Sequence, residues 1–314
     1  MTALVSPPAL AADMPIGAVI GQIIGHLTDV IVKTAPHAII GAGPEPVHQM
    51  RVATRRLRSA LGLFGKIIDC PEAAAIKAGA RALAAILGPP RDWDVFLAGT
   101  AAAIAAALPD DEAVARLLES ARKSRQRAYA ALRRYVVGPA FRKLCAQLAA
   151  FAAQRPWEPG LPGKAPDLAR FAARALKKRH ARLRATGDGP DGAGIATLAV
   201  PDLHALRLQA KRLRYAAEFL APAFPAHVIG RYLRRLSDLQ EALGHLNDAS
   251  VAAALMAQLG RAGGLGYGGG VVRGFVAGRA DDHRDEIASA WRKFRKFDGA
   301  ALFESARLAD LDKD

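Results

Sequence analysis

The chain has 314 residues, 51% of them hydrophobic and 23% charged, a composition that excludes an intrinsically disordered protein. Its 44 lysines and arginines against 29 acidic residues give a formal net charge of +15, so we expect a polyanionic partner such as nucleic acid, an anionic membrane or a chain of phosphates. Two cysteines without a C-x-x-C pair exclude a disulfide framework and disfavour a zinc cluster.

Apolar residues recur every three or four positions along nearly the whole chain, which is the spacing of α-helices. A segment rich in proline and glycine, 155–163, predicts a linker, because these residues end helices. We expect helices over residues 15–34, 45–68, 72–87, 93–107, 110–137 and 139–154 before this linker, and over 167–185, 200–221, 226–243, 247–260 and 271–297 after it. Further glycine-rich breaks are expected at 187–194 and 263–270. With no convincing strand pattern, the sequence predicts an all-α fold.

No stretch offers about 18 apolar residues uninterrupted by glycine, proline or charge, so we do not expect a membrane span. The opening, Met1 to Ala12, lacks a basic segment and contains two prolines. We therefore interpret it as a frayed terminus rather than a signal peptide, and we expect a cytoplasmic location.

A short basic string occurs twice, at positions separated by almost half of the chain length. The string H-x-x-R-x-x-x-R-R-L-R spans residues 48–58, and it returns at 204–214 with one lysine in place of an arginine. A second match keeps the same offset, because the segment 87–95 and the segment 243–251 both start with Leu-Gly and share an aspartate and a valine. Two matches in one register indicate a duplicated unit.

The duplication predicts two similar helical bundles, 1–160 and 161–314, related by a pseudo-twofold axis. On a helix, each string gathers its cationic side chains on one face and its apolar side chains on the opposite face. The two cationic faces consist of His48, Arg51, Arg55 and Arg58, with Arg56 at the flank, and of His204, Arg207, Lys211 and Arg214, with Arg212 at the flank.

Like charges at helical spacing repel by a few tenths of a kcal/mol per pair, and no carboxylate lies inside either string. A stability cost without local compensation indicates function, and the planar fork of arginine suits bidentate contacts with phosphate. A single basic face, or a single histidine beside arginine, more often belongs to a solvated surface, but the duplication favours a binding site. Alternatively, the rows pair with acidic residues elsewhere, such as Asp281, Asp282, Asp285 and Glu286.

Other charged residues have two readings each. Asp92 and Asp248 follow the Leu-Gly segments, where they either cap the next helix or orient arginines of the cationic faces. Two further basic helix faces either add phosphate contacts that widen the groove or belong to solvated surfaces. One face carries Arg122, Arg125 and Arg133, and the other carries Lys177, Lys178, Arg179 and Arg182.

Signals for an enzyme are poor. The chain has no P-loop motif and no G-x-G-x-x-G after a strand, and no carboxylates cluster with a histidine to hold a catalytic metal. The positive potential around His48 and His204 repels divalent cations, so a metal site is disfavoured there. We expect no catalytic residue, no cofactor and no metal.

The segments 47–58 and 203–215, together with the Leu-Gly segments, resemble the CHAD family, the conserved histidine α-helical domain. The resemblance covers roughly residues 15–300. It implies two helical bundles flanking a basic central groove that binds inorganic polyphosphate, with one basic string on each wall. One position departs from the symmetry, since Asn247 stands where the first half has Arg91.

CHAD-family members are often joined to a triphosphate-cleaving domain with an E-x-E-x-K motif, which this chain lacks. The resemblance therefore implies a stand-alone, non-catalytic polyphosphate-binding module, in the cytoplasm and on polyphosphate granules.

Nucleic-acid binding is the second hypothesis, but aromatic residues are only 6% and do not interleave with the basic rows, and no base-reading motif is present. The third is a phosphate-chemistry enzyme with His48 or His204 as phosphoacceptor. The sequence does not indicate how many copies of the chain associate.

Overall fold

The computed structural model describes residues 8, 10–11, 13–41, 43–161, 168–189, 194–261, 266–278, 280–297 and 299–311, and within these ranges it leaves the side chains of 196, 245–249, 261, 280–283 and 307–311 undescribed. The described residues form helices and no strand, which confirms the predicted all-α class. The α-helices are α1 (Ile16–Ile40), α2 (Glu45–Leu63), α3 (Pro71–Phe96), α4 (Ala102–Ala107), α5 (Glu112–Val137), α6 (Pro139–Gln154), α7 (Leu168–Asp188), α8 (Val200–Leu220), α9 (Ala226–Arg261), α10 (Gly266–Ala277), α11 (Ala280–Arg295) and α12 (Gly299–Leu311). A π-helical segment (Leu97–Ala101) joins α3 to α4, and short 3-10 turns occupy Glu158–Gly160, Ile195–Thr197 and Ala221–Ala223.

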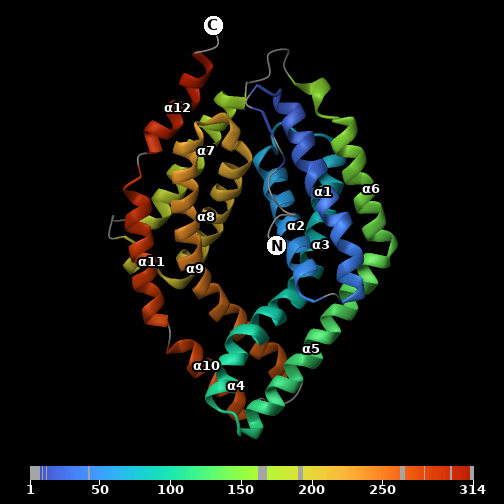
Figure 1. Ribbon diagram of the computed structural model, residues 1–314, viewed down its shortest axis with the longest axis vertical. Helices are drawn as coiled ribbons and strands as arrows, with labels where there is room; N and C mark the ends of the chain where they lie inside the picture. Colours follow the sequence, from blue (N-terminus) through green and yellow to red (C-terminus); the bar gives the residue numbers. More distant parts are fainter. Residues whose placement is uncertain are drawn as a thin grey trace.

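The helices form two groups that meet along α2 and α8. Helices α1, α2, α3 and α6 pack on one side, and α7, α8, α9, α11 and α12 pack on the other (Figure 1). Helices α4, α5 and α10 lie at the lower end of the view, where α3 and α9 extend to meet them (Figure 1). The duplication, and the division into the halves 1–160 and 161–314, stay predictions.

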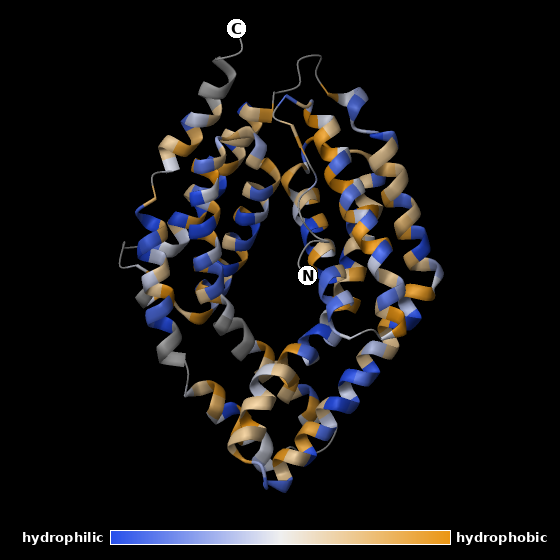
Figure 2. Ribbon diagram, in the orientation of Figure 1, coloured by the Kyte–Doolittle hydropathy of each residue, from blue (hydrophilic) through white to orange (hydrophobic). Residues whose placement is uncertain are grey.

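Two apolar cores hold this arrangement together. The larger core draws buried side chains from α1, α2, α3, α5 and α6 and from α7, α8, α9, α11 and α12, so it crosses both groups. The smaller core joins α3, α4 and α5 to α9 and α10. Hydrophobic residues gather where the helices of each group face one another, and hydrophilic residues lie both on the outer helix faces and on the faces between the two groups (Figure 2). Because α3, α5 and α9 contribute to both cores, they connect the upper and lower parts of the molecule.

Helix α1 is apolar along most of its length. It is long and apolar enough to cross a membrane by length and composition, with a mean hydropathy of 1.4 over its most apolar window. In the structure, 61% of that window is buried inside the protein, where isoleucines such as Ile20 and Ile23 are inaccessible. The prediction that the protein has no membrane partner stays a prediction.

The predicted turns at the two Leu-Gly segments are wrong. Helix α3 continues through Pro89 and Pro90, where the sequence predicts a break between 72–87 and 93–107. An interior proline costs a helix about 3 kcal/mol. However, Leu87 lies fully buried in the larger core and Trp93 in the smaller one, and each such side chain contributes roughly 2–3 kcal/mol. Burial on both sides of the prolines therefore outweighs the local penalty.

The same reason applies to α9, which spans both predicted helices 226–243 and 247–260. Asp92 and Asp248 consequently lie inside helices, so the prediction that they cap helix N-termini is wrong. Near the C-terminal end, the predicted helix 271–297 is two helices, α10 and α11, and α12 was not predicted.

A buried carboxylate connects α3 to α5. Arg125 Nε donates a hydrogen bond to Asp94 Oδ1 at 2.6 Å, and Tyr129 Oη donates one to Asp94 Oδ2 at 2.7 Å. The Arg125 guanidinium also lies over the Tyr129 ring, 4.5 Å from its centroid. Burial, and then the hydrogen bond to Asp94, raise the pKa of Tyr129 to about 12. Arg125, which the sequence offers as a phosphate contact, thus has Asp94 as a partner inside the protein.

Replacing Asp94 with alanine is expected to lower the free energy of unfolding by about 2–3 kcal/mol, because it leaves a buried tyrosine hydroxyl and an arginine without their acceptor. Urea denaturation measures this. The control is Glu119→Ala, which removes an exposed carboxylate paired with Arg122 and should change the stability by less than about 0.5 kcal/mol. Equal losses in the two variants would contradict the structural role of Asp94.

A buried histidine joins α7 to α9, α11 and α12. His180 is 8% exposed, and its Nδ1 lies 2.9 Å from Tyr232 Oη in a hydrogen bond. The rings of Phe294 and Phe303 pack around it, with centroids 5.4 and 5.6 Å away. Burial, and then the charge of Arg184, lower the pKa of His180 to about 4. The imidazole is therefore neutral in the folded protein at neutral pH.

This histidine makes folding sensitive to acid. In the unfolded chain it binds a proton below its ordinary pKa of about 6.5, whereas the folded protein resists protonation until about pH 4. Its contribution is present above pH 6.5 and decreases as the pH falls, by about 3 kcal/mol at pH 4. His180→Gln should flatten the decline of unfolding free energy between pH 7 and 4.5, measured by urea titration. Parallel pH profiles for the two proteins would refute this assignment.

Candidate anion-binding site

Helix α2 positions the first basic string through its amphipathic pattern. Val47, Met50, Ala53 and Leu57 are fully buried in the larger core. The opposite face therefore turns its cationic side chains away from the core. Pro46 in the first turn suits the start of the helix, where backbone N–H groups have no intrahelical partner.

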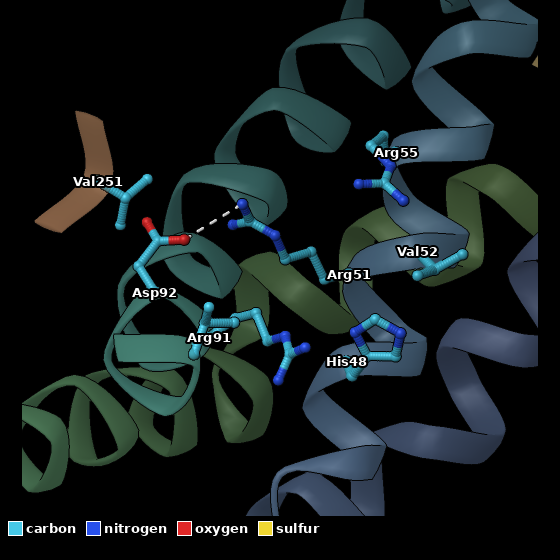
Figure 3. Close-up of a pocket in the computed structure, with 8 residues that line it drawn as sticks. His48, Arg51, Val52, Arg55, Arg91, Asp92 and Val251 are labelled. Atoms are coloured by element: carbon cyan, nitrogen blue, oxygen red, sulfur yellow. Dashed lines mark ion pairs between the residues drawn. The ribbon is translucent and has the colours of Figure 1, made fainter. Parts of the chain in front are cut away.

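The first string lines a pocket of about 160 Å³ between α2, α3 and α9. Its lining residues are His48, Arg51, Val52 and Arg55 from α2, Arg91, Asp92 and Val95 from α3, and Val251 from α9. The guanidinium groups of Arg51 and Arg91 and the His48 ring extend into the space between α2 and α3 (Figure 3). The pocket thus brings together residues from both predicted halves.

The pocket carries three guanidinium groups and one carboxylate. Arg51 Nη2 lies 3.3 Å from Asp92 Oδ1, and each side chain is about one-third exposed. Burial lowers the pKa of Arg51, an effect that Asp92 opposes and that Arg55 and Arg91 add to. Burial, and then the charge of Arg91, lower the pKa of His48, so the imidazole is neutral at neutral pH. A net positive pocket with a neutral histidine favours an anion, whose charge would in turn favour the imidazolium.

Helix α8 carries the second string but contributes no residue to this pocket. His204 and Arg212 are exposed, and Arg207, Lys211 and Arg214 are half-buried. Arg214 Nε donates to Glu218 Oε1 at 2.8 Å, one turn along its own helix. The groove with one string on each facing wall stays a prediction.

The two strings meet through Tyr215 and Glu218 of α8. The guanidinium carbons of Arg55 and Arg56 lie 5.3 and 5.9 Å from the Tyr215 ring centroid. Arg56, largely buried, donates to Glu218 Oε2, while Arg214 donates to the other oxygen of the same carboxylate. The expectation of two unneutralised rows is therefore wrong for Arg56 and Arg214, and Asp92 likewise neutralises part of Arg51.

Two residues of this region were missing from the predicted site. Arg91 was known only as part of the Leu-Gly segment, and the continuous helix α3 carries it into the pocket. Glu218 was recognisable in the sequence as an i,i+4 partner of Arg214. Its second contact, to Arg56, depends on the packing of α2 against α8, which no local pattern predicts.

The remaining predicted residues lie outside the pocket. Arg58, Lys177 and Lys178 are exposed, and Arg122 is exposed and pairs with Glu119 at 3.8 Å. Asp92 faces Arg51, which agrees with its alternative role of orienting an arginine.

The side chain of Asp248 lies outside the described residues, as do those of Asp281 and Asp282. Asp285 and Glu286, the other acidic partners considered for the basic rows, are exposed on α11. Among the described residues, no group of three histidine, cysteine or acidic side chains could hold a metal ion.

Comparison with known proteins gives the family. The family model for the CHAD domain matches residues 22–257, which is most of the chain. The chain belongs to the CHAD domain family. Every residue that lines the pocket falls within the matched segment of this CHAD domain.

Two solved structures are similar to this chain over most of its length. The crystal structure of the CHAD domain from the plant Ricinus communis is similar, with a TM-score of 0.76 and 29% sequence identity over 90% of this chain and 93% of that chain. The fold also resembles PptA from Streptomyces chartreusis, with a TM-score of 0.61 and 19% identity over 90% of this chain and 99% of that chain. A search of curated proteins found no match.

Proposed function

We propose that this CHAD-domain protein binds inorganic polyphosphate without cleaving it, with the His48 pocket as the principal contact. The observation that carries the proposal is the convergence of Arg51, Arg55 and Arg91 on one pocket with a single carboxylate, Asp92. The CHAD family is often linked to polyphosphate binding or metabolism, and a formal net charge of +15 favours a polyanion.

The chemistry of the pocket suits a phosphate group. Its volume of about 160 Å³ is many times the roughly 10–15 Å³ of such space that a single water molecule needs, so the pocket has room for a polar group larger than water. Arginine forks bind phosphate oxygens in bidentate geometry. Nε of Arg55 is buried without a hydrogen-bond partner among the described residues, and a phosphate oxygen would supply an acceptor at this guanidinium.

A chain longer than the pocket would continue along the second string. We propose that His204, Arg207 and Lys211 add contacts there, since α2 and α8 pack against each other. Arg56 and Arg214 would act by holding the two helices together through Glu218. The proposed location is the cytoplasm, including polyphosphate granules.

The test is a titration of the whole protein with long-chain polyphosphate at 50 and 200 mM salt. A site with about four phosphate contacts should lose roughly 50-fold in affinity over this range, because binding releases counterions. Single-stranded DNA of equal charge should compete at least tenfold less well. Equal competition would favour nucleic-acid binding, and shortening of the chain during incubation would favour an enzyme; either result would overturn the proposal.

A further inference from the structure

A second cluster of arginines lies on the α7–α8 pair. Gln209 Nε2 donates to Thr186 Oγ1 at 2.9 Å, which fixes how the two helices lie against each other. On α8, Arg212 lies one turn after Gln209. On α7, Arg182 lies one turn before Thr186, and Arg179 lies one turn before Arg182. The packed, antiparallel helices therefore bring three guanidinium groups from two helices to one place.

Arg179 is the half-buried member of this cluster. Its Nη1 donates to the backbone oxygen of Ala175 at 3.1 Å. Burial, and then the charges of Arg182 and Arg212, lower its pKa, and no acidic group opposes them. Within the part of the chain that the structure describes, none of these three arginines pairs with a carboxylate.

Equivalent arginines of the two basic strings have different surroundings. Arg56 and Arg212 occupy the same position in the two basic strings. Arg56 is buried and neutralised by Glu218, whereas Arg212 is exposed beside two further arginines. Three like charges that a protein holds together without an acid lower its stability, and a bound oxyanion would relieve this.

We propose that Arg179, Arg182 and Arg212 form a second oxyanion site, which binds a phosphate group on the exposed side of the α7–α8 pair. The site is distinct from the His48 pocket, whose lining comes from α2, α3 and α9. The phosphate group is either free orthophosphate or one unit of a phosphate chain. The inference does not depend on what the His48 pocket binds.

The test uses the full chain with Arg51, Arg55 and Arg91 replaced by alanine, so that the His48 pocket loses all three of its guanidinium groups. Orthophosphate and long-chain polyphosphate are titrated separately at constant ionic strength, and the melting temperature is recorded with and without each. Arg179→Gln or Arg212→Gln on this background should weaken binding of at least one of the two ligands tenfold or more. Lys177→Gln, which removes an exposed charge from the same helix, is the matched control and should weaken it less than twofold.

The two ligands distinguish the sources. Loss for both identifies a site for any phosphate group, and loss for the chain alone identifies a site for a unit of the chain. If Arg179→Gln and Lys177→Gln have equal effects on both ligands, the second site does not exist. Without ligand, the protein with Arg179→Gln should melt no lower than its parent, because removing Arg179 removes repulsion between like charges. A lower melting temperature would show that the arginines stabilise the fold. That result would also overturn the proposal.

Discussion

Replacement of Arg51, Arg55 and Arg91 together by alanine is expected to weaken the binding of long-chain polyphosphate by at least 100-fold. Hydrogen bonds to charged groups contribute about 1.5–3 kcal/mol each, and tenfold in affinity corresponds to about 1.4 kcal/mol. The change also leaves the carboxylate of Asp92 in the pocket without Arg51, where it would repel phosphate. The loss should thus exceed that of three unrelated charges.

The measurement is a titration at two salt concentrations, with the slope of log affinity against log salt as a second readout. The slope should decrease by about two, because three phosphate contacts on a single strand disappear. The matched control removes three exposed charges from α5 and α6, with Arg133, Arg134 and Lys143 replaced by alanine. If the pocket variant and this control bind polyphosphate equally, the pocket is not the principal contact.

Replacement of Glu218 by alanine should lower the free energy of unfolding by about 3–5 kcal/mol. Glu218 is 13% exposed and Arg56 is 10% exposed, so the variant leaves a buried guanidinium without its carboxylate. The same change frees Arg214 and loosens the contact between α2 and α8. Urea denaturation followed by circular dichroism measures the loss.

A second variant separates the charge from the side-chain volume. Adding Arg56→Met to Glu218→Ala removes both charges, and it should recover more than half of the lost stability, because a buried pair often contributes little relative to apolar residues of similar size. A single variant that loses less than about 1 kcal/mol, or a double variant that loses more than the single one, would refute the role of Glu218 as the connection between the two basic helices.

Helical periodicity predicted the fold class and the extents of α2, α5, α6 and α8 to within a few residues, because these helices each bury one regular apolar face. It failed at Pro89 and Gly244, where local signals predict turns. There the buried side chains on both sides belong to two different cores, and tertiary packing outweighs the local preference.

In the candidate site too, features set by one helix were predictable and features set by packing between helices were not. The repeat correctly placed His48, Arg51 and Arg55 on one side of α2, since a face depends only on spacing along one helix. The participation of Arg91 and Val251, and the neutralisation of Arg56 by Glu218, depend on contacts between helices far apart in sequence. A single sequence contains no local signal for such contacts.

The most direct test of the proposed site is a crystal structure of the protein grown with a short polyphosphate. We expect a phosphate group in the His48 pocket, with oxygens within hydrogen-bond distance of at least two of the guanidinium groups of Arg51, Arg55 and Arg91. If the protein binds polyphosphate in solution but the crystals show the chain elsewhere and this pocket empty, the account of the site is wrong.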